Sequence, residues 1–486
     1  MNIFIVNWNL ESQDFIEAAE KLEEAGHKIV YWVGSGTTRF EAATAVRQKF
    51  KNTIFHNHFA AILGQPAKEF ENTQFNPPSE ETINELSEAE SVLSTIKQFD
   101  KLDKFSLEKK NLFHSYLEYW LGVIDKLKPD VFIFSAWPHT GYNFIIYCIA
   151  HYLKIKVILF EYARVGDRLL LINDWKIGSL ALKEEIKRNQ DKKYGLDDLS
   201  PDIKDYYKLQ IDPVPYQLPP DLVILESRVT GFNLFKRKLG MIVGSIKNLT
   251  IFAQTYNYFL KQFKSNLKKE YEEWQSQPDF KKKYIYIALH YQPECSTSPL
   301  GGAYVDQALM VKTLSAAVPD DVRIYVKEHP YQWMPTGLSY SRYRYEGYYK
   351  SIAKLRNVSL MPIKTNTVTL IEKSQAVATV TGTAGFEAVL KQIPVLVFGH
   401  TYYRDCPGVF KISSVQSAKE AIDKIISGFK VGRQEIINYL VSLDRVSFHG
   451  YLEPVIEVQS KLTPEENRNN FVKAIESELK KMAKKY

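Results

Sequence analysis

The segment YIYIALH (Tyr284–His290) is a short apolar run that ends on a histidine. A second run, VRIYVKEHP (Val322–Pro330), ends on a lysine, a glutamate and another histidine, and a third, AVATVTGTAG (Ala376–Gly385), ends on two glycines among threonines. Short apolar runs separated by helix-length segments are typical of buried parallel strands joined by crossover helices. Because ligands of such sheets bind outside the carboxyl ends of the strands, we expect these strand ends to line one crevice.

The start of the chain predicts a second sheet. Asn2–Asn7 (NIFIVN) has the pattern of a strand, Ser12–Ala25 has helical spacing that stops at Gly26, and His27–Val33 is again strand-like. This βαβ unit lacks the GxGxxG sequence of dinucleotide-binding folds. Two further strands are predicted in this half: Val131–Ser135 and Lys156–Phe160.

The bulk properties are those of a globular protein with two domains. The chain has 486 residues, of which 45% are hydrophobic and 24% charged. No signal peptide is evident, no apolar run reaches the roughly 20 residues that span a bilayer, and the three cysteines have no metal-type spacing. We therefore expect a reduced, cytoplasmic protein. A net charge of +7 permits anionic ligands or an anionic membrane surface, but is too diffuse to indicate nucleic acid.

A basic segment separates the two predicted sheets. Phe232–Lys269 contains eight lysines and arginines and no acidic residue, interleaved with apolar side chains. It fits a basic amphipathic helical pair on an anionic membrane face, and it fits an interdomain linker with a solvated basic face equally well. The predicted domains are an N-terminal Rossmann-like domain at 1–225, the basic segment at 226–275, a C-terminal Rossmann-like domain at 276–440, and helices at 441–486 that pack back across the cleft.

The turn Thr381–Gly385 carries the clearest chemistry. Small residues between a strand and a helix let backbone N–H groups approach a phosphate, and the helix N-terminus adds positive partial charge. Glu387, placed in the first helical turn, can accept hydrogen bonds from ribose hydroxyls. His329, fixed by Pro330 at the end of its strand, can donate to a phosphate oxygen and stabilise a departing nucleotide.

Ionisable groups also follow two strands of the first half. His139 lies in the loop after Val131–Ser135, and Glu161 follows Lys156–Phe160, with Asp167 nearby. Each could be a surface or capping residue, but adjacent strand ends in a parallel sheet favour a shared site.

Four motifs together resemble a known enzyme group. HYQPE (His290–Glu294), YVDQ (Tyr304–Gln307), YVKEHP (Tyr325–Pro330) and TGTAGFEAV (Thr381–Val389) are similar to the C-terminal half of bacterial capsule and surface-polysaccharide glycosyltransferases. The nearest group is the capsule β-Kdo transferases, which use CMP-Kdo. The histidine–proline pair also resembles GT-B sialyltransferases and teichoic-acid polymerases.

The resemblance implies the GT-B fold, two Rossmann-like α/β domains facing across a cleft, with the nucleotide-sugar in the C-terminal domain and a glycan or lipid-linked acceptor in the N-terminal one. The expected donor site consists of His290, Gln292, Glu294, Lys327, His329, Thr381, Gly382, Thr383, Ala384, Gly385 and Glu387. The expected catalytic groups are Glu161, with Asp167 and His139 as further acceptor-side candidates, and His329 at the leaving phosphate. Where capsule Kdo transferases carry Glu-Asp-Gly-Phe, this chain has Glu161-Tyr162-Ala163-Arg164.

Several alternatives stay open at this point. A UDP-sugar transferase, a nucleotide-sugar 2-epimerase and a CDP-alditol phosphotransferase share the fold and the glycine-rich turn, and a glycan-binding scaffold could retain both. No DxD motif stands at a strand end in the second half, so we expect metal-independent chemistry with no cofactor besides the nucleotide-sugar. The expected location is the cytoplasm, with possible peripheral contact on the inner face of the membrane.

Overall fold

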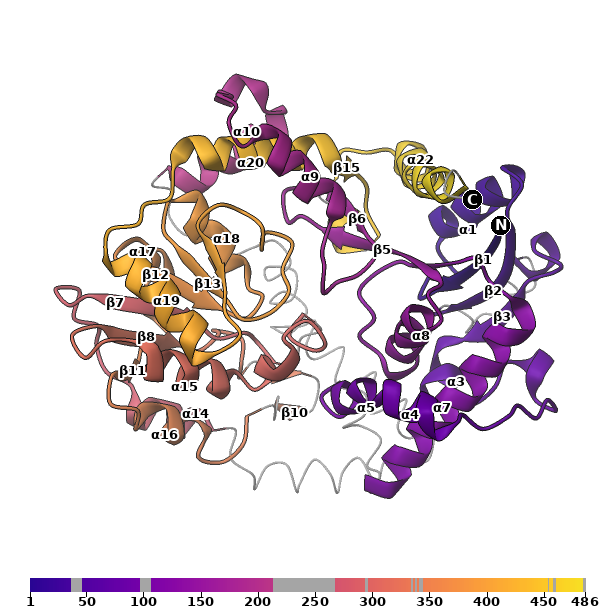
Figure 1. Cartoon of the computed structure of the whole chain (residues 1–486), viewed down its shortest axis with the longest axis horizontal. Helices are drawn as coiled ribbons and strands as arrows, with labels where there is room; N and C mark the ends of the chain where they lie inside the picture. Colours follow the sequence, from indigo (N-terminus) through magenta and orange to yellow (C-terminus); the bar gives the residue numbers. More distant parts are fainter. Residues whose placement is uncertain are drawn as a thin grey trace. The chain divides into compact units, whose positions relative to one another are not determined.

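The computed structural model of the protein describes residues 1–35, 46–96, 106–212, 267–292, 296–333, 335–336, 339–340, 344–452, 454–457 and 460–483. The chain divides into two compact units (Figure 1). Unit 1 contains Met1–Tyr206, Ser298–Gly302 and Ile437–Tyr486, and unit 2 contains Tyr207–Thr297 and Ala303–Ile436.

Unit 1 is built on a seven-stranded sheet with the order β15-β6-β5-β4-β1-β2-β3. Its strands are β1 (Asn2–Val6), β2 (Lys28–Gly34), β3 (Ile54–Asn57), β4 (Val131–Phe134), β5 (Lys156–Tyr162), β6 (Arg168–Ile172) and β15 (Phe448–His449). The strands from β1 to β5 pair in parallel, whereas β6 and β15 are antiparallel additions at one edge. Because β1 pairs with both β2 and β4, the strand order reverses between β1 and β4.

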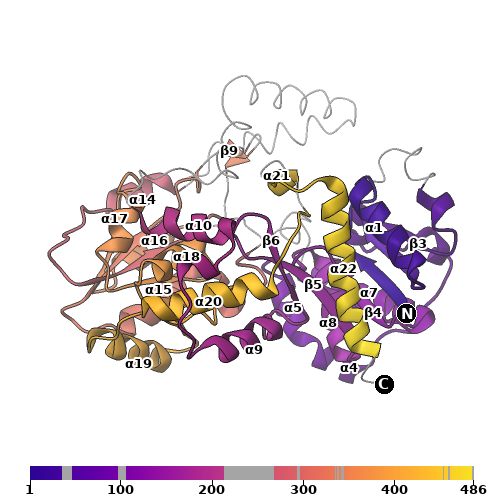
Figure 2. The ribbon, with the colours of Figure 1, turned by 90° about the horizontal axis from the view of Figure 1, so that it is seen from above.

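Alternation of side chains along β1 explains the two layers of helices. Ile3 and Ile5 pack into a core with α1 (Gln13–Glu24) and α22 (Pro464–Ala483), which lie side by side (Figure 2). Phe4 and Val6 point the other way, into a core with α7 (Ser106–Leu127) and α8 (Gly141–Tyr152). The C-terminal helix therefore belongs to the same unit as the first βα unit of the chain.

Other short elements complete unit 1. They are α3 (His58–Ile62), η1 (Lys68–Phe70), α4 (Glu80–Glu85), α5 (Ser87–Leu93), α9 (Leu180–Asn189), η2 (Leu196–Asp198) and α21 (Pro454–Glu457). Two helices, α10 (Pro201–Ile211) and α20 (Arg433–Val446), each contain one of the chain boundaries between the units.

Unit 2 has a six-stranded, wholly parallel sheet with the order β11-β8-β7-β12-β13-β14. Its strands are β7 (Tyr284–Ala288), β8 (Arg323–Lys327), β11 (Val358–Leu360), β12 (Ala376–Thr379), β13 (Val395–Val397) and β14 (Val409–Lys411). Their near-continuous burial is what a parallel sheet covered on both faces requires. Here the strand order reverses between β7 and β12.

The helices of unit 2 follow its strands in the expected alternation. They are α14 (Lys268–Trp274), α15 (Gln307–Ala317), α16 (Tyr348–Ala353), α17 (Thr367–Glu372), α18 (Thr383–Leu390) and α19 (Val415–Ile426). A 3-10 turn, η3 (Gly302–Val305), precedes α15, and β9 (Pro335–Thr336) pairs with β10 (Ser339–Tyr340).

The predicted fold class is confirmed, since both halves are α/β units with parallel-rich sheets. The predicted domain boundaries, and the cleft of the GT-B arrangement, stay predictions. Most of the basic segment Phe232–Lys269, with its predicted membrane contact, lies outside the described residues. Within the described part of the chain, no helix combines the length and apolar character needed to cross a membrane.

Candidate functional site

The strand order of unit 2 reverses where two of the predicted site segments meet. His290 follows β7, and the turn Thr381–Gly385 follows β12. The Nε2 atom of His290 lies 3.1 Å from the backbone nitrogen of Thr381 and 3.0 Å from the Oγ1 atom of Thr379. A hydrogen-bonded bridge therefore spans the point at which doubly wound sheets bind their ligands.

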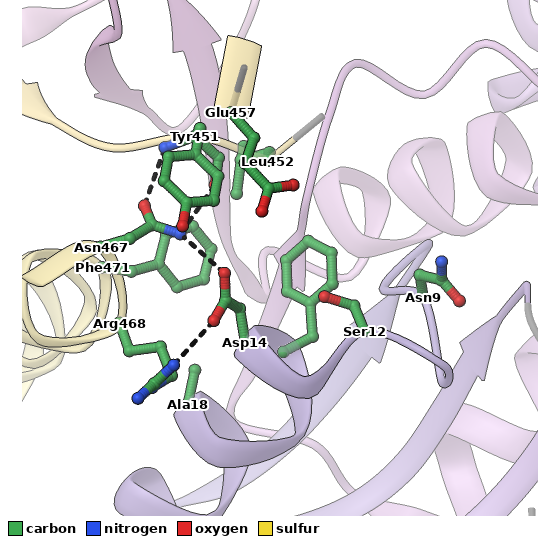
Figure 3. Close-up of a pocket in the computed structure, with 11 residues that line it drawn as sticks. Asn9, Ser12, Asp14, Ala18, Tyr451, Leu452, Glu457, Asn467, Arg468 and Phe471 are labelled. Atoms are coloured by element: carbon green, nitrogen blue, oxygen red, sulfur yellow. Dashed lines mark hydrogen bonds and ion pairs between the residues drawn. The ribbon is translucent and has the colours of Figure 1, made fainter. Parts of the chain in front are cut away.

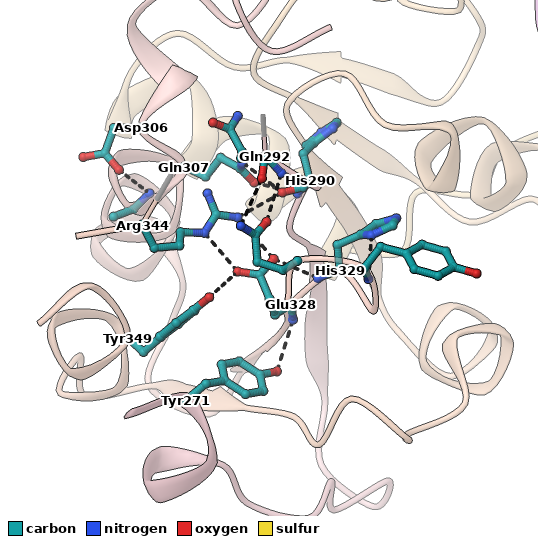
Figure 4. Close-up of polar contacts among 12 residues, drawn as sticks. Tyr271, His290, Gln292, Asp306, Gln307, Glu328, His329, Arg344 and Tyr349 are labelled. Carbon is teal, nitrogen blue, oxygen red and sulfur yellow. Dashed lines mark hydrogen bonds and ion pairs between the residues drawn. The ribbon is translucent and has the colours of Figure 1, made fainter. Parts of the chain in front are cut away.

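The tautomer of the neutral His290 ring follows from these partners. A backbone N–H can only donate, so Nε2 accepts from Thr381 and the ring proton of the neutral imidazole resides on Nδ1. Gln307, at the start of α15, accepts from the backbone nitrogen of His290 at 2.7 Å and donates to its carbonyl at 3.4 Å (Figure 4). Both the ring and the backbone of His290 are thus held in place.

Two glycines allow the turn to approach its neighbours closely. A Cβ atom on Gly382 would lie 2.8 Å from Thr379 Oγ1 and 3.1 Å from His290 Cε1, and one on Gly385 would lie 2.3 Å from the hydroxyl of Tyr403. Real Cβ atoms do not approach other atoms at the shorter of these distances. Lack of a side chain is therefore what brings the turn against His290 and Tyr403.

The turn presents hydrogen-bond donors. Thr381 Oγ1 is buried, and the residues that the structure describes give it no hydrogen-bond partner. Gly382 caps α18 without a side chain, and the first N–H groups of an α-helix have no intrahelical acceptor. A buried hydroxyl beside a helix N-terminus is a suitable place for an anionic oxygen, as the sequence predicts.

His329 lies two residues beyond the end of β8, and its hydrogen bond defines the tautomer of the neutral ring. Its Nδ1 atom accepts from the backbone nitrogen of Tyr331 at 3.2 Å, which places the proton of the neutral ring on Nε2. Its own backbone nitrogen donates to Glu328 Oε1 at 2.8 Å. The Nε2–H group is the hydrogen-bond donor that the predicted role at a phosphate requires.

Glu328 and Arg344 form a buried ion pair that the sequence analysis missed. The Nε and Nη2 atoms of Arg344 lie 2.9 and 3.1 Å from the two carboxylate oxygens of Glu328, and Tyr349 donates to the same carboxylate at 2.7 Å (Figure 4). Arg344 Nη2 also donates to the carbonyl of His290 at 2.9 Å. The pair therefore ties together the two strand ends that carry His290 and His329.

The ammonium group of Lys327 is hydrogen-bonded within unit 2. Its Nζ atom donates to the carbonyl of Thr365 at 2.6 Å and to Oγ1 of Thr367 at 2.7 Å. The side chain is buried, and burial lowers the pKa of Lys327 from 10.5 to about 8. The predicted donor-site role of Lys327 stays a prediction.

A pH-dependent stability follows from Lys327. Between about pH 8 and pH 10.5 the unfolded chain binds a proton that the folded chain releases, so the folded state gains stability as pH rises. Relative to Lys327→Met, the wild type should gain about 3 kcal/mol over this interval in urea denaturation. Lys312→Met, at an exposed position on α15, should retain the wild-type pH dependence; equal pH profiles for wild type and Lys327→Met would contradict the assignment.

One predicted donor-site residue is placed differently from the expectation. Glu387 is the fifth residue of α18 and lies in its second turn, because the helix begins only at Thr383. Burial raises the pKa of Glu387, opposed by a hydrogen bond with the side chain of Thr383 and by the charge of Lys391. Gln292 is buried, with its side chain bonded to Thr297.

Two further donor-site residues were predicted, Ala384 and Glu294. Ala384 lies partly exposed in the first turn of α18, whereas Glu294 lies outside the described residues. The donor-site roles of Glu387, Gln292, Ala384 and Glu294 stay predictions.

In unit 1, two predicted catalytic carboxylates are already engaged. Glu161 does not follow β5 as expected but lies within it, buried and opposite Leu170 of the antiparallel β6. The Nδ1 atom of His449 lies 2.6 Å from Asp167, and Ser460 donates to the same carboxylate. Burial raises the pKa of Asp167, but these two bonds outweigh it and lower the pKa overall. The bond with Asp167 raises the pKa of His449.

His139 lies in a group of polar side chains at the carboxyl ends of β3 and β4. Its Nδ1 atom lies 2.6 Å from the carbonyl of Trp137, which can only accept, so the basic lone pair of the neutral ring is on Nε2. His58 Nδ1 lies 2.8 Å from the hydroxyl of Tyr142, and burial followed by the charge of His139 lowers the pKa of His58. His58 was missed, although the two closely spaced histidines of FHNHF (Phe55–Phe59) could have indicated it.

The described side chains form no candidate metal site. In that part of the chain, no three His, Cys, Asp or Glu side chains gather in a geometry that could hold an ion. Metal-independent chemistry stays a prediction.

Comparison with protein families gives one match. Residues 295–426 match the capsule polysaccharide biosynthesis protein family. The matched stretch contains Lys327–Pro330 and the turn Thr381–Gly385, so the resemblance drawn from these motifs is confirmed. A comparison with curated proteins found no match.

The solved structures found to be similar include two kinds of enzyme. The KpsC β-Kdo 2,7 transferase of Thermosulfurimonas dismutans is 12% identical, covers 76% of this chain and 97% of its own, and has a TM-score of 0.31. MnaA of S. aureus with UDP is 14% identical over 91% of each chain, with a TM-score of 0.26. The UDP-GlcNAc 2-epimerase of Neisseria meningitidis is 14% identical over 91% and 98%, with a TM-score of 0.24. These TM-scores are low, and the similarities assign neither donor nor acceptor to this chain.

Proposed function

We propose that this protein is a glycosyltransferase of capsule or surface-polysaccharide synthesis that uses a CMP-activated, Kdo-like sugar. The observation that carries the proposal is the bridge between His290 and Thr381 at the strand-order reversal of unit 2. Beside it lie the N-terminus of α18 and the Thr381 hydroxyl, which has no hydrogen-bond partner among the described residues. The hydroxyl and the helix N-terminus suit a phosphate, and the bridge fixes the turn that carries them to β7. The family match over 295–426 supports a role in capsule synthesis.

The chemistry of transfer assigns a role to each group. An acceptor hydroxyl attacks the anomeric carbon, the bond from that carbon to the phosphate oxygen breaks, and the nucleoside monophosphate leaves with the bonding electron pair. His329 Nε2–H, the Thr381 hydroxyl and the N–H groups of α18 would stabilise the negative charge on the leaving phosphate.

The proton released by the acceptor hydroxyl needs a base, and the predicted acceptor-side groups are the candidates. His139 fits this role through its Nε2 lone pair. Glu161, which lies within β5, and Asp167, which is bonded to His449, remain candidates. A substitution series at these three positions would rank them by loss of transfer rate.

A product assay distinguishes this reaction from its relatives. The protein would be incubated separately with CMP-Kdo, UDP-GlcNAc and CDP-glycerol, with and without capsular glycan, and the products analysed by mass spectrometry. We expect CMP release and a glycan heavier by one sugar, both lost in His329→Ala. Epimerised UDP-sugar formed without acceptor, or a phosphodiester-containing product, would replace the proposal with an epimerase or a phosphotransferase.

A further inference from the structure

Unit 1 contains a pocket that the donor site does not use. It has a volume of about 90 Å³ and lies between the first turn of α1 and residues 451–471 (Figure 3). The rings of Phe15, Tyr451 and Phe471 line it and are almost fully buried. The volume has room for several water-sized groups, and so for a small ring rather than an extended chain.

The floor of the pocket is fixed by bonds within the protein. The side chain of Asn467 accepts from the backbone nitrogen of Tyr451 at 2.8 Å and donates to its carbonyl at 3.1 Å. Arg468 contacts Asp14 at 2.9 Å and Glu17 at 2.7 Å. Burial and the charge of Asp14 raise the pKa of Tyr451 to about 12, so its hydroxyl stays protonated at neutral pH. A ligand would therefore meet a preformed surface.

The rim of the pocket offers polar groups to a ligand. Ser12 is the N-cap residue of α1, and its side chain makes no capping hydrogen bond. The carboxylate of Glu457 is directed into the pocket (Figure 3), and the described residues give it no hydrogen bond or ion pair. Asn9 lies on the same rim, with its side-chain oxygen accepting from the backbone nitrogen of Glu11. A hydroxyl, a carboxylate and an amide can together hold several ligand hydroxyls.

The charge of the pocket limits what can bind. Arg468 pairs with two carboxylates, Asp14 and Glu17, and Glu457 adds a third, so the surroundings carry an excess of negative charge. This negative charge would repel a phosphate or a sugar carboxylate. The occupant that fits is uncharged, rich in hydroxyl donors and apolar on its ring faces.

The position of the pocket connects it with the rest of unit 1. It lies at the α1 turn directly after β1, the strand at which the sheet order reverses towards β4. Ligands of doubly wound sheets bind beside such reversals. Aromatic rings that bury the C–H faces of a ring, with a carboxylate taking its hydroxyls, form a suitable carbohydrate-binding surface.

We infer that this pocket is a subsite for one uncharged pyranose ring of the acceptor glycan, held by Glu457 and Ser12 against Phe15, Tyr451 and Phe471. This inference rests on the proposed transferase function. The acceptor would then carry a neutral sugar near its site of extension, whereas the donor sugar binds elsewhere through its nucleotide.

Saturation-transfer NMR on the full chain tests the subsite with a matched pair of probes. Methyl β-D-glucopyranoside and methyl β-D-glucuronide differ by one carboxylate, so the pocket should bind the first and disfavour the second. Glu457→Gln should weaken binding of the neutral glycoside about tenfold, because a hydrogen bond to a charged group is lost. Glu465→Gln, which changes an exposed carboxylate on α22 outside the pocket, should bind as wild type does.

Three outcomes would overturn the inference: equal binding of the glucuronide, unchanged binding by Glu457→Gln, or no binding of the neutral glycoside. CMP binding, measured on the same samples, shows whether only the subsite is rejected or the proposed CMP-sugar transferase function as well. Retained CMP binding without glycoside binding rejects the subsite alone. Glycoside binding without CMP binding supports the subsite and rejects the CMP donor.

Discussion

Arg344→Met is expected to lower the free energy of unfolding of unit 2 by about 3–5 kcal/mol. The substitution removes the cation from a buried pair. Among the described residues it leaves the Glu328 carboxylate, 1% exposed, with Tyr349 and a backbone N–H as its donors. It also removes the hydrogen bond to the carbonyl of His290. Methionine keeps much of the side-chain volume, so the loss reports charge and hydrogen bonding rather than a cavity.

Urea denaturation, monitored by amide hydrogen exchange in β8, measures this loss. Arg356→Met provides the matched control, because Arg356 pairs with Asp320 through side chains that are 61% and 81% exposed. Exposed pairs contribute about 0–1 kcal/mol, so the control should differ little from wild type. Equal, small effects of the two substitutions would show that the Glu328–Arg344 pair does not hold the strand ends together.

His290→Ala is expected to weaken nucleotide binding by about tenfold to a hundredfold. The substitution removes the acceptor of the Thr381 N–H group and the partner of Thr379, so the turn that should hold the phosphate loses its attachment to β7. Gly382, packed against the imidazole, would face a void. The effect should appear in affinity at unchanged stoichiometry.

Isothermal titration with CMP measures this effect. His27→Ala is a suitable control, because His27 is paired with Glu476 within unit 1 and lies outside the donor site. It should leave the affinity for CMP unchanged. A His290→Ala protein that binds CMP as tightly as the control would contradict the placement of the phosphate at the β7–β12 reversal.

The strand ends could be predicted because the signal is local. Apolar runs that stop at His290, His329 and Thr381 have the length of strands, and the intervening segments have helical spacing. Parallel pairing then places their carboxyl ends at one edge of the sheet. The bond between His290 and Thr381 could not be predicted, because it depends on β7 and β12 being neighbours in the sheet.

What the sequence could not reveal depends on tertiary contacts. Arg344 lies in a tyrosine- and arginine-rich stretch far from His290, and only the fold brings its guanidinium to that carbonyl. Glu161 was expected beyond its strand because a charged residue interrupts an apolar run. Pairing with the antiparallel β6 extends the strand past it.

The central claim is that the strand-order reversal of unit 2 holds the phosphate of a CMP-activated sugar. A thermal-shift panel of CMP, CDP, UMP, UDP, GDP and ADP on wild type and His329→Ala tests it most directly, because a ligand of the native state raises the melting temperature. We predict stabilisation by CMP that is lost in His329→Ala. Stabilisation by UDP alone, or none by any nucleotide, would contradict the claim.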